Sequence, residues 1–132
     1  MKIQPIIRSF AFFLSLSISS ATNAGSLTPL EALAVVEKVH VHAIAKNFCA
    51  LESLMAKGFL WSFGGDSSAR DAIEAWRTDP AYLKNLGRVT RMRCKYTEEK
   101  RVTCPANAGK GYRAAFKQLP EGWRMISFVA GD

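Results

Sequence analysis

Two cysteines stand ten positions apart in the segment RVTRMRCKYTEEKRVTC, which covers residues 88–104. If residues 98–100 form the loop of a β-hairpin, Cys94 lies directly opposite Cys104, and such cross-strand neighbours are within reach of a disulfide. A redox site is disfavoured because the chain has no C-x-x-C motif, and a zinc site because no histidine lies near the pair. The spacing therefore predicts a structural disulfide between Cys94 and Cys104.

His40 is the first candidate for a catalytic or ligand-binding residue. At 100° per residue it falls in the middle of an apolar helical stripe, between Val36 and Ile44. A histidine at this place is either a core residue that makes one or two hydrogen bonds, or a general base or ligand contact on the floor of a pocket between helix and sheet. His42 shares a polar face with Lys38, and we expect it to project into solvent.

Asp66 is the second catalytic candidate and lies in the segment FGGDSSAR. Glycines ahead of a helix can present N–H groups to a phosphate, but this segment lacks the G-x-x-x-x-G-K-[ST] pattern of a nucleotide site. We expect Asp66 to cap the helix that follows it, and the catalytic alternative is that it meets His40 in space. No Ser-His-Asp set, cofactor motif or metal-ligand set can be placed from the spacing. These features favour a protein that is not an enzyme, although they leave the question open.

Cys49 is the third cysteine and has no partner in the predicted hairpin. It is either a small buried residue or a thiol that pairs with another molecule or with one of the other two cysteines. A nucleophilic role needs an activating base on the same helical face. His42 lies roughly two turns away along the helix, which is too far for contact.

Basic residues alternate with other residues along positions 89–96, a segment that we expect to form a strand. The basic side of this strand, with its extension onto a later strand, comprises Arg91, Arg93, Lys95, Arg113 and Lys117. One interpretation is an ordinary solvated sheet face. The other is a surface that binds an anionic partner. Like charges on one strand face repel each other, and a bound anion would offset this repulsion.

The N-terminal residues 1–24 have the three-part layout of a secretory signal peptide. Lys2 and Arg8 precede a short apolar run over residues 10–18, and small residues follow it. The run is shorter than the roughly 20 apolar residues of a membrane span. We expect an exported protein, periplasmic or secreted, whose mature chain forms a single small domain over residues 25–132 and has no integral membrane span.

The charge balance bears on the partners of the mature chain. Cleavage after Ala24, or after Ala21, removes two of the 18 basic residues and none of the 11 acidic ones, which leaves 16 against 11, a net charge of +5. A basic protein attracts anionic partners at long range. Outside the cytoplasm these are an anionic cell-envelope polymer, lipid head groups or an acidic protein, rather than nucleic acid.

Residues 28–56 carry the pattern of one long amphipathic helix. Thr28 and Glu31 have the spacing of a capping box, and Gly58 is a suitable stop. A break near Asn47 is the alternative to a continuous helix. The predicted apolar face comprises Leu33, Val36, Ile44, Leu51 and Leu54.

The rest of the chain predicts a short strand or extended segment over residues 59–65, then two short helices and a series of strands. Ser68 and Asp71 form a second capping box, and Thr78 or Asp79 caps a helix that begins at Pro80 and ends at Gly87. The predicted strands are residues 89–96, 101–105, 112–119 and 123–129. Helices followed by an antiparallel meander make an α+β fold, with a long N-terminal helix and short helices packed on the sheet.

The segment GFLWSFGGDSSARDAIEAWRTDPAYLKNLGRV, followed by CP, GYRAAF and a terminal GWRMISFVAGD, resembles a group of small exported proteobacterial proteins. The resemblance covers most of the mature chain from about Phe59 onward. It implies a shared fold and an exported location, and it implies no catalytic assignment. In layout, the chain is also similar to the NTF2-like, or SnoaL-like, cone, in which a curved sheet wraps a helix and leaves a pocket at its mouth.

Three classes of function are consistent with these features. The first, which we favour, is an exported binding or accessory protein that engages an anionic envelope component through its basic sheet face. The second is a small NTF2-like enzyme or pocket protein that uses His40. The third is an inhibitor or immunity-type protein that blocks a secreted enzyme.

Overall fold

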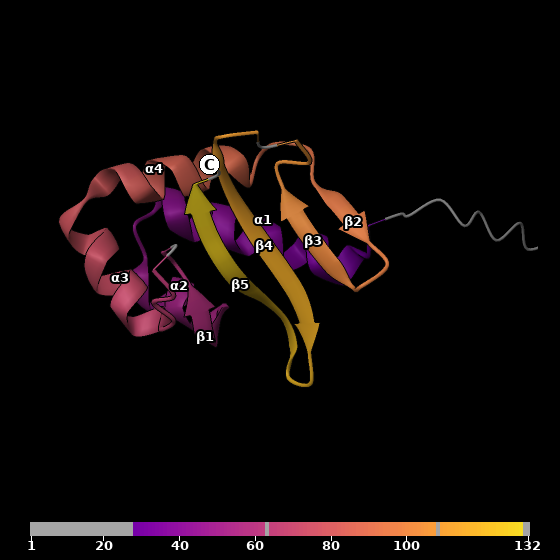
Figure 1. Cartoon of the computed structure of the whole chain (residues 1–132), viewed down its shortest axis with the longest axis horizontal. Helices are drawn as coiled ribbons and strands as arrows, with labels where there is room; N and C mark the ends of the chain where they lie inside the picture. The colour runs from indigo at the N-terminus through magenta and orange to yellow at the C-terminus, as the bar shows by residue number, and fades with distance from the viewer. Residues whose placement is uncertain (1–27, 63, 108, 131–132) are drawn as a thin grey trace, which may run out of the picture.

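The computed structural model describes residues 28–62, 64–107 and 109–130 (Figure 1). The predicted signal peptide, residues 1–24, lies outside the described residues. In chain order the described elements are α1 (Leu30–Ile44), α2 (Phe48–Ser53), β1 (Met55–Leu60), α3 (Ala69–Thr78), α4 (Pro80–Val89), β2 (Lys95–Thr97), β3 (Arg101–Cys104), β4 (Tyr112–Leu119) and β5 (Gly122–Ala130).

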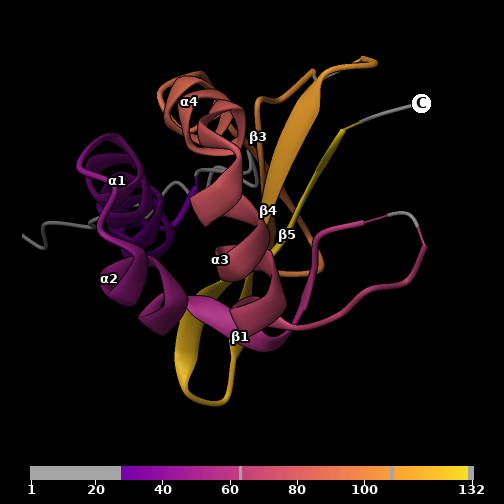
Figure 2. The same cartoon turned by 90° about the vertical axis from the view of Figure 1, so that its left-hand side faces the viewer.

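The strands form one sheet in the order β1-β5-β4-β3-β2. The last four strands run antiparallel to their neighbours, which confirms the predicted meander, and β1 joins the edge parallel to β5. The helices lie together on one face of this sheet (Figure 2). The α+β fold class is therefore confirmed, with helices packed on one side of a five-stranded sheet.

The long N-terminal helix is interrupted, at the point where the sequence offered a break. Lys46 adopts a positive φ of 54°, which no α-helix tolerates, and Asn47 then caps α2 by accepting a hydrogen bond from the Ala50 amide at 3.2 Å. α2 ends at Ser53, so the predicted continuation of the helix to residue 56 is wrong. Gly58 does not stop a helix, because it lies within β1.

The start of α1 also differs from the prediction. Its N-cap residue is Pro29, and no side chain caps the helix, so the predicted Thr28 cap does not form. The two later caps are confirmed: the Ser68 hydroxyl accepts from the Asp71 amide at 3.2 Å, and the Asp79 carboxylate accepts from the Ala81 amide at 3.0 Å. Short polar side chains fix a helix start locally, and for that reason these two starts were predictable.

The predicted strand over residues 89–96 is wrong for most of its length. α4 continues past Gly87 to Val89, and a turn follows it before β2 begins at Lys95. Thr90 accounts for the extension: its amide and its hydroxyl both donate to the carbonyl of Leu86, at 3.1 and 2.7 Å. This local bonding closes the helix end and leaves only the last two residues of the predicted strand in the sheet.

The hairpin between β2 and β3 forms in the predicted register. Tyr96 pairs with Val102, and Lys95 pairs with Thr103. One step further, Cys94 and Cys104 form a disulfide with 4.4 Å between their Cα atoms, which confirms the predicted pair. Cys104 is fully buried, so the disulfide is part of the core side of the sheet.

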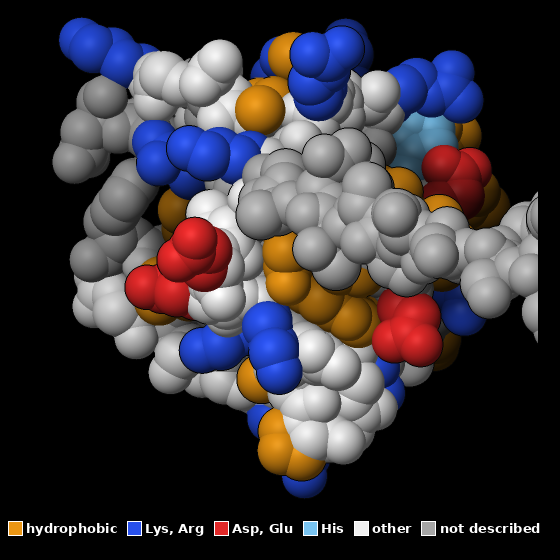
Figure 3. All heavy atoms as spheres, turned by 90° about the vertical axis from the view of Figure 1, so that its right-hand side faces the viewer, with side chains coloured by type: hydrophobic (Ala, Val, Ile, Leu, Met, Phe, Trp, Pro, Cys, Tyr) orange, Lys and Arg blue, Asp and Glu red, His pale blue; other side chains and the backbone are white. Residues whose placement is uncertain are grey.

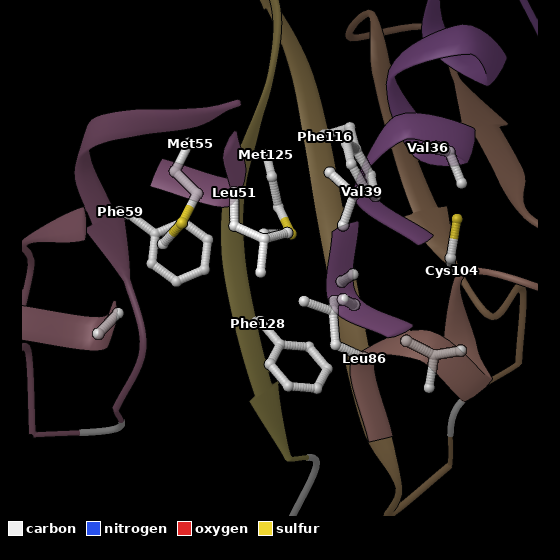
Figure 4. Packing of buried hydrophobic residues seen from close by; sticks show 14 of the residues in the cluster. Val36, Val39, Leu51, Met55, Phe59, Leu86, Cys104, Phe116, Met125 and Phe128 are labelled. Atoms are coloured by element: carbon white, nitrogen blue, oxygen red, sulfur yellow. The ribbon is translucent and has the colours of Figure 1, made fainter. Parts of the chain in front are cut away.

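The core lies between the helices and the inner face of the sheet (Figure 4). Trp76 of α3 is at its centre, with its ring edge-to-face against Phe59 of β1 and Phe128 of β5. The ring centroids are 5.7 Å apart for Phe59 and 5.8 Å apart for Phe128. Aromatic pairs at these distances add to the free energy gained by burying the rings. The core thus joins the parallel edge strand β1 to the antiparallel meander.

The buried side of α1 agrees with the predicted one only in part, through Val36 and His40. Val36 is buried as expected, but Leu33 is 41% exposed and Ile44 is 63% exposed. The residues that α1 buries are Ala32, Val36, Val39, His40 and Ala43. Because α1 is apolar around most of its circumference, hydrophobic periodicity alone does not select the side that packs.

Candidate functional site

His40 lies between α1 and α4 and not between helix and sheet, and it is one of the residues that line a cavity between these two helices. Its Nδ1 is 2.8 Å from the carbonyl oxygen of Gly87 and 3.1 Å from the hydroxyl oxygen of Thr90. A carbonyl oxygen only accepts, so Nδ1 carries the proton and donates it. With 4% of its surface exposed, His40 has the partners expected of a core histidine that joins two helices.

The other ring nitrogen of His40 is closed off. Its Nε2 is buried and has no hydrogen-bond partner among the described residues. In the neutral ring this nitrogen holds the lone pair that a general base would use. A substrate cannot reach the atom in this conformation, so the geometry supports a structural role for His40 better than a catalytic one.

Asp66 is not brought together with His40. It is exposed, its carboxylate accepts from the Ser62 hydroxyl at 2.7 Å, and its carbonyl accepts from the Trp61 amide at 3.3 Å. These bonds close the loop between β1 and α3, where Gly65 supplies a positive φ of 86°. The helix cap that we expected from Asp66 comes from Ser68 instead.

A cavity of about 550 Å³ opens between the C-terminal half of α1 and α4. Its apolar wall includes Ala43, Ile44 and Leu83. Its basic residues are Lys46, Lys84, Arg88 and Arg91, and its lining includes no acidic residue from the part of the chain that the structure describes. We refer to it as the α1–α4 cavity.

Sequence reasoning pointed to Arg91 but missed the other three cations of this cavity. Lys84 and Arg88 are four residues apart on the predicted helix, a spacing that places them on one face, and this signal was available in the sequence. Lys46 could not be predicted as a cavity residue from the sequence, because its position depends on the break between α1 and α2.

The outer face of the sheet, which faces away from the helices, is basic. Arg101 of β3, Lys117 of β4 and Arg124 of β5 pair across adjacent strands in one register, and we call these three residues the cationic row. The predicted residues Lys95 and Arg113 alternate with core residues in the same sense as Lys117, and so they lie on this face as well.

Two residues of the predicted basic face lie elsewhere. Arg91 follows the end of α4 and lines the α1–α4 cavity, and Arg93 lines a second cavity beside Met92 and Leu33. Arg91 and Arg93 do not lie on the sheet, because the segment before Lys95 is not a strand. Arg101 and Arg124 were missed, although each alternates with buried neighbours in its own strand, a pattern that would have placed them outside.

The cationic row has no carboxylate partner within residues 28–62, 64–107 and 109–130. Among the described residues the one ion pair joins Arg77 to Glu74 within α3, at 3.9 Å. Arg124 donates to the carbonyl of its neighbour Trp123 at 2.8 Å, and the bond leaves its charge uncompensated. Like charges directly opposite each other in a sheet destabilise it, so the row is a local cost to folding.

Basic side chains are also conspicuous at the end of the molecule that carries β2. Figure 3 shows Lys and Arg side chains above and below an area of hydrophobic side chains, and Asp and Glu side chains on either side of it. Exposed hydrophobic residues of the described chain include Leu33 of α1 and Met92, which both line the second cavity.

Cys49 is exposed and free, so the interpretation of a small buried residue is wrong. The disulfide between Cys94 and Cys104 also excludes either of them as its partner in this structure. Within the described ranges, no group of three or more His, Cys, Asp or Glu side chains is placed to hold a metal ion. The helices described for this chain include none with the length and apolar character needed to span a bilayer.

Comparisons with known proteins find a likeness in structure and none in sequence. No protein-family model matches the chain, and no curated protein matches it in sequence. The chain is similar in structure to an NTF2-like protein of unknown function from Shewanella oneidensis MR-1, with a TM-score of 0.47 and 7% sequence identity over 77% of this chain and 97% of that one.

Proposed function

We propose that this protein is an exported binding protein that holds an anionic polymer of the cell envelope against the outer face of its sheet. The observation that carries the proposal is the cationic row: three positive side chains stand in register on three adjacent strands, and no described carboxylate pairs with them. Neighbouring strands are about 4.8 Å apart, so the row presents charges at short, regular intervals. A polymer with closely spaced negative charges matches such an array.

The cost of the row supports a binding role. Side-by-side cations lower the stability of the free protein, and a bound polyanion removes that repulsion. Lys95 and Arg113 lie on the same face and extend the positive surface along the strands, both in the same direction from the row. An ordinary solvated face would more often intersperse acidic residues among the basic ones.

Export is part of the proposal. The disulfide between Cys94 and Cys104 is typical of proteins that fold in an oxidising compartment, and residues 1–24 carry the pattern of a signal peptide. In such a compartment the anionic partner is an envelope polymer, and nucleic acid is scarce.

The two other functions are less well supported. An enzyme that uses His40 would need access to its Nε2, which is buried. An inhibitor of an acidic secreted enzyme would use the same basic face, and binding to an acidic protein in place of the polymer is therefore an outcome of the test.

The test is sedimentation of the mature chain, from residue 25, with purified cell-wall sacculi at low and moderate salt. We expect binding at about 20 mM NaCl that is largely lost at about 300 mM, because salt screens exposed charges beyond a few ångströms. The variant Arg101→Glu/Lys117→Glu should lose binding at low salt. Lys38→Glu/Arg70→Glu changes the net charge equally on exposed positions of α1 and α3 and should retain it.

Two outcomes would contradict this function. Equal loss in both double variants would reduce the effect to net charge, and salt-independent sedimentation would exclude an electrostatic contact. Failure to bind sacculi, together with salt-sensitive capture of an acidic secreted protein by the wild type alone, would replace the polymer with a protein partner.

A further inference from the structure

The α1–α4 cavity is a second place at which this protein can hold a ligand, separate from the outer face of the sheet. It lies on the helical side of the molecule, between the last turns of α1 and the length of α4. Its volume of about 550 Å³ is within the range of small-molecule sites. No residue of the cationic row lines it.

The helices α1 and α4 approach each other closely at Gly87, beside this cavity. A Cβ atom built on Gly87 would lie 3.4 Å from the Cγ1 atom of Ile44, an ordinary van der Waals contact, so a small residue fits at this position. At this approach His40 of α1 binds the Gly87 carbonyl at 2.8 Å. The cavity is thus formed by a fixed contact between two helices and is preorganised for a ligand.

The apolar part of the cavity is exposed at a cost. Ile44 lines it and remains 63% exposed, which is unusual for a large aliphatic side chain in a helix. Together with Ala43 and Leu83 it makes a wall suited to an alkyl chain. A ligand that covers Ile44 would be stabilised by the burial of this apolar surface.

The charges around this wall have one sign. Lys84 and Arg88 stand one turn apart on α4, Lys46 follows α1, and Arg91 follows α4. The partner of the Arg88 guanidinium is the neutral side-chain amide of Asn85, at 3.2 Å. None of the four forms an ion pair with a described carboxylate. Four cations beside an apolar wall, with no acid among the lining residues, complement a ligand with an anionic head and an apolar tail.

We propose that the α1–α4 cavity binds a single-chain amphiphile with a carboxylate head, such as a medium-chain fatty acid. The alkyl chain packs against Ala43, Ile44 and Leu83. The carboxylate accepts charge-assisted hydrogen bonds from Arg88 and Lys84 at the rim. A neutral or cationic head of the same chain length lacks this attraction.

The test is calorimetric titration of the mature chain with decanoate below its micellar concentration, beside acetate and decyltrimethylammonium. We expect saturable binding of one decanoate per chain, and no detectable binding of acetate, which lacks the tail, or of decyltrimethylammonium, which has the wrong charge. The variants Lys84→Glu/Arg88→Glu and Ile44→Asp should each weaken decanoate binding at least about tenfold. All three substituted positions are exposed, so the fold should be retained.

The matched control is Arg101→Glu/Lys117→Glu, which should bind decanoate as tightly as the wild type. This variant separates the two proposals, because it removes the polymer surface and leaves the cavity intact. Amide chemical shifts of the wild type should change along α4 and the end of α1 when decanoate is added.

Three results would overturn the inference: no saturable binding of decanoate, equal affinity in the cavity variants, or shift changes confined to other elements. A fourth would replace the ligand with a second copy of the chain. In that case the wild type would dimerise, Ile44→Asp would be monomeric, and decanoate would bind neither form.

Discussion

The Nδ1–H of His40 donates to the carbonyl oxygen of Gly87 across 2.8 Å and thereby joins α1 to the last turn of α4. The final carbonyls of an α-helix lack backbone partners within the helix, and here the amide of Arg91 binds the carbonyl of Arg88. His40 supplies the closest donor to the Gly87 carbonyl, and the Thr90 hydroxyl is a second donor at 3.3 Å. This bond explains why a histidine occupies the apolar side of α1, and it holds the two walls of the α1–α4 cavity together.

Replacing His40 should destabilise the fold without a direct effect at the outer face. His40→Ala removes the closest donor to the buried Gly87 carbonyl, which keeps only the Thr90 hydroxyl at 3.3 Å, and it opens a void, so the free energy of unfolding should fall by about 2–4 kcal/mol. Urea denaturation of the mature chain measures this. The control His42→Ala, two residues along the same helix, should change stability by less than about 0.5 kcal/mol. Equal losses in the two variants would show that the bond contributes nothing specific.

The disulfide should provide much of the stability of the β2–β3 hairpin. Replacing both Cys94 and Cys104 by serine should lower the free energy of unfolding by about 3 kcal/mol, as the loop-closure argument gives for a ten-residue separation. Thermal unfolding with and without a reducing agent measures the same quantity in the wild type. The exposed Cys49 serves as control, and Cys49→Ser should leave the melting temperature unchanged. A reduced protein as stable as the oxidised one would contradict the prediction.

Relieving the charge repulsion in the cationic row should stabilise the free protein. Lys117 stands between Arg101 and Arg124, so Lys117→Gln should raise the free energy of unfolding by about 0.2–1 kcal/mol at low salt. The gain should disappear at high salt, where the repulsion is screened. Urea denaturation at two salt concentrations gives both values, with Lys38→Gln on α1 as the control. A gain that persists at high salt would have to come from packing instead of charge.

Trp76 should be needed for its ring and dispensable for its N–H group. Its indole nitrogen is buried with no hydrogen-bond partner among the described residues, while its ring contacts Phe59 and Phe128. Trp76→Ala should cost about 3–5 kcal/mol of unfolding free energy. Trp76→Phe keeps an aromatic ring and removes the unpaired donor, so it should cost clearly less. Similar losses in the two variants would mean that the N–H group has a partner in solution.

The part of the fold that sequence reasoning predicted correctly depends on neighbours close in the chain. Ser68 and Asp79 start their helices because each side chain reaches an amide two or three residues ahead. The hairpin register follows from a short loop, and it set Cys94 opposite Cys104. The order of helices before an antiparallel meander was likewise readable from local patterns and confirmed the α+β class.

The sequence by itself determined the starts of α3 and α4, the disulfide and the excess of basic over acidic residues, because each depends on composition or on a few adjacent residues. Only the tertiary structure decided which cations act together. Arg101 and Arg124 join Lys117 because three strands pair in one register, and Arg91 moves to the α1–α4 cavity because Thr90 extends α4. The tertiary structure also decided which side of α1 packs, because His40 on that side binds the carbonyl of Gly87, a residue 47 positions away. Contacts between distant segments depend on how whole elements pack, and periodicity within one element does not contain that information.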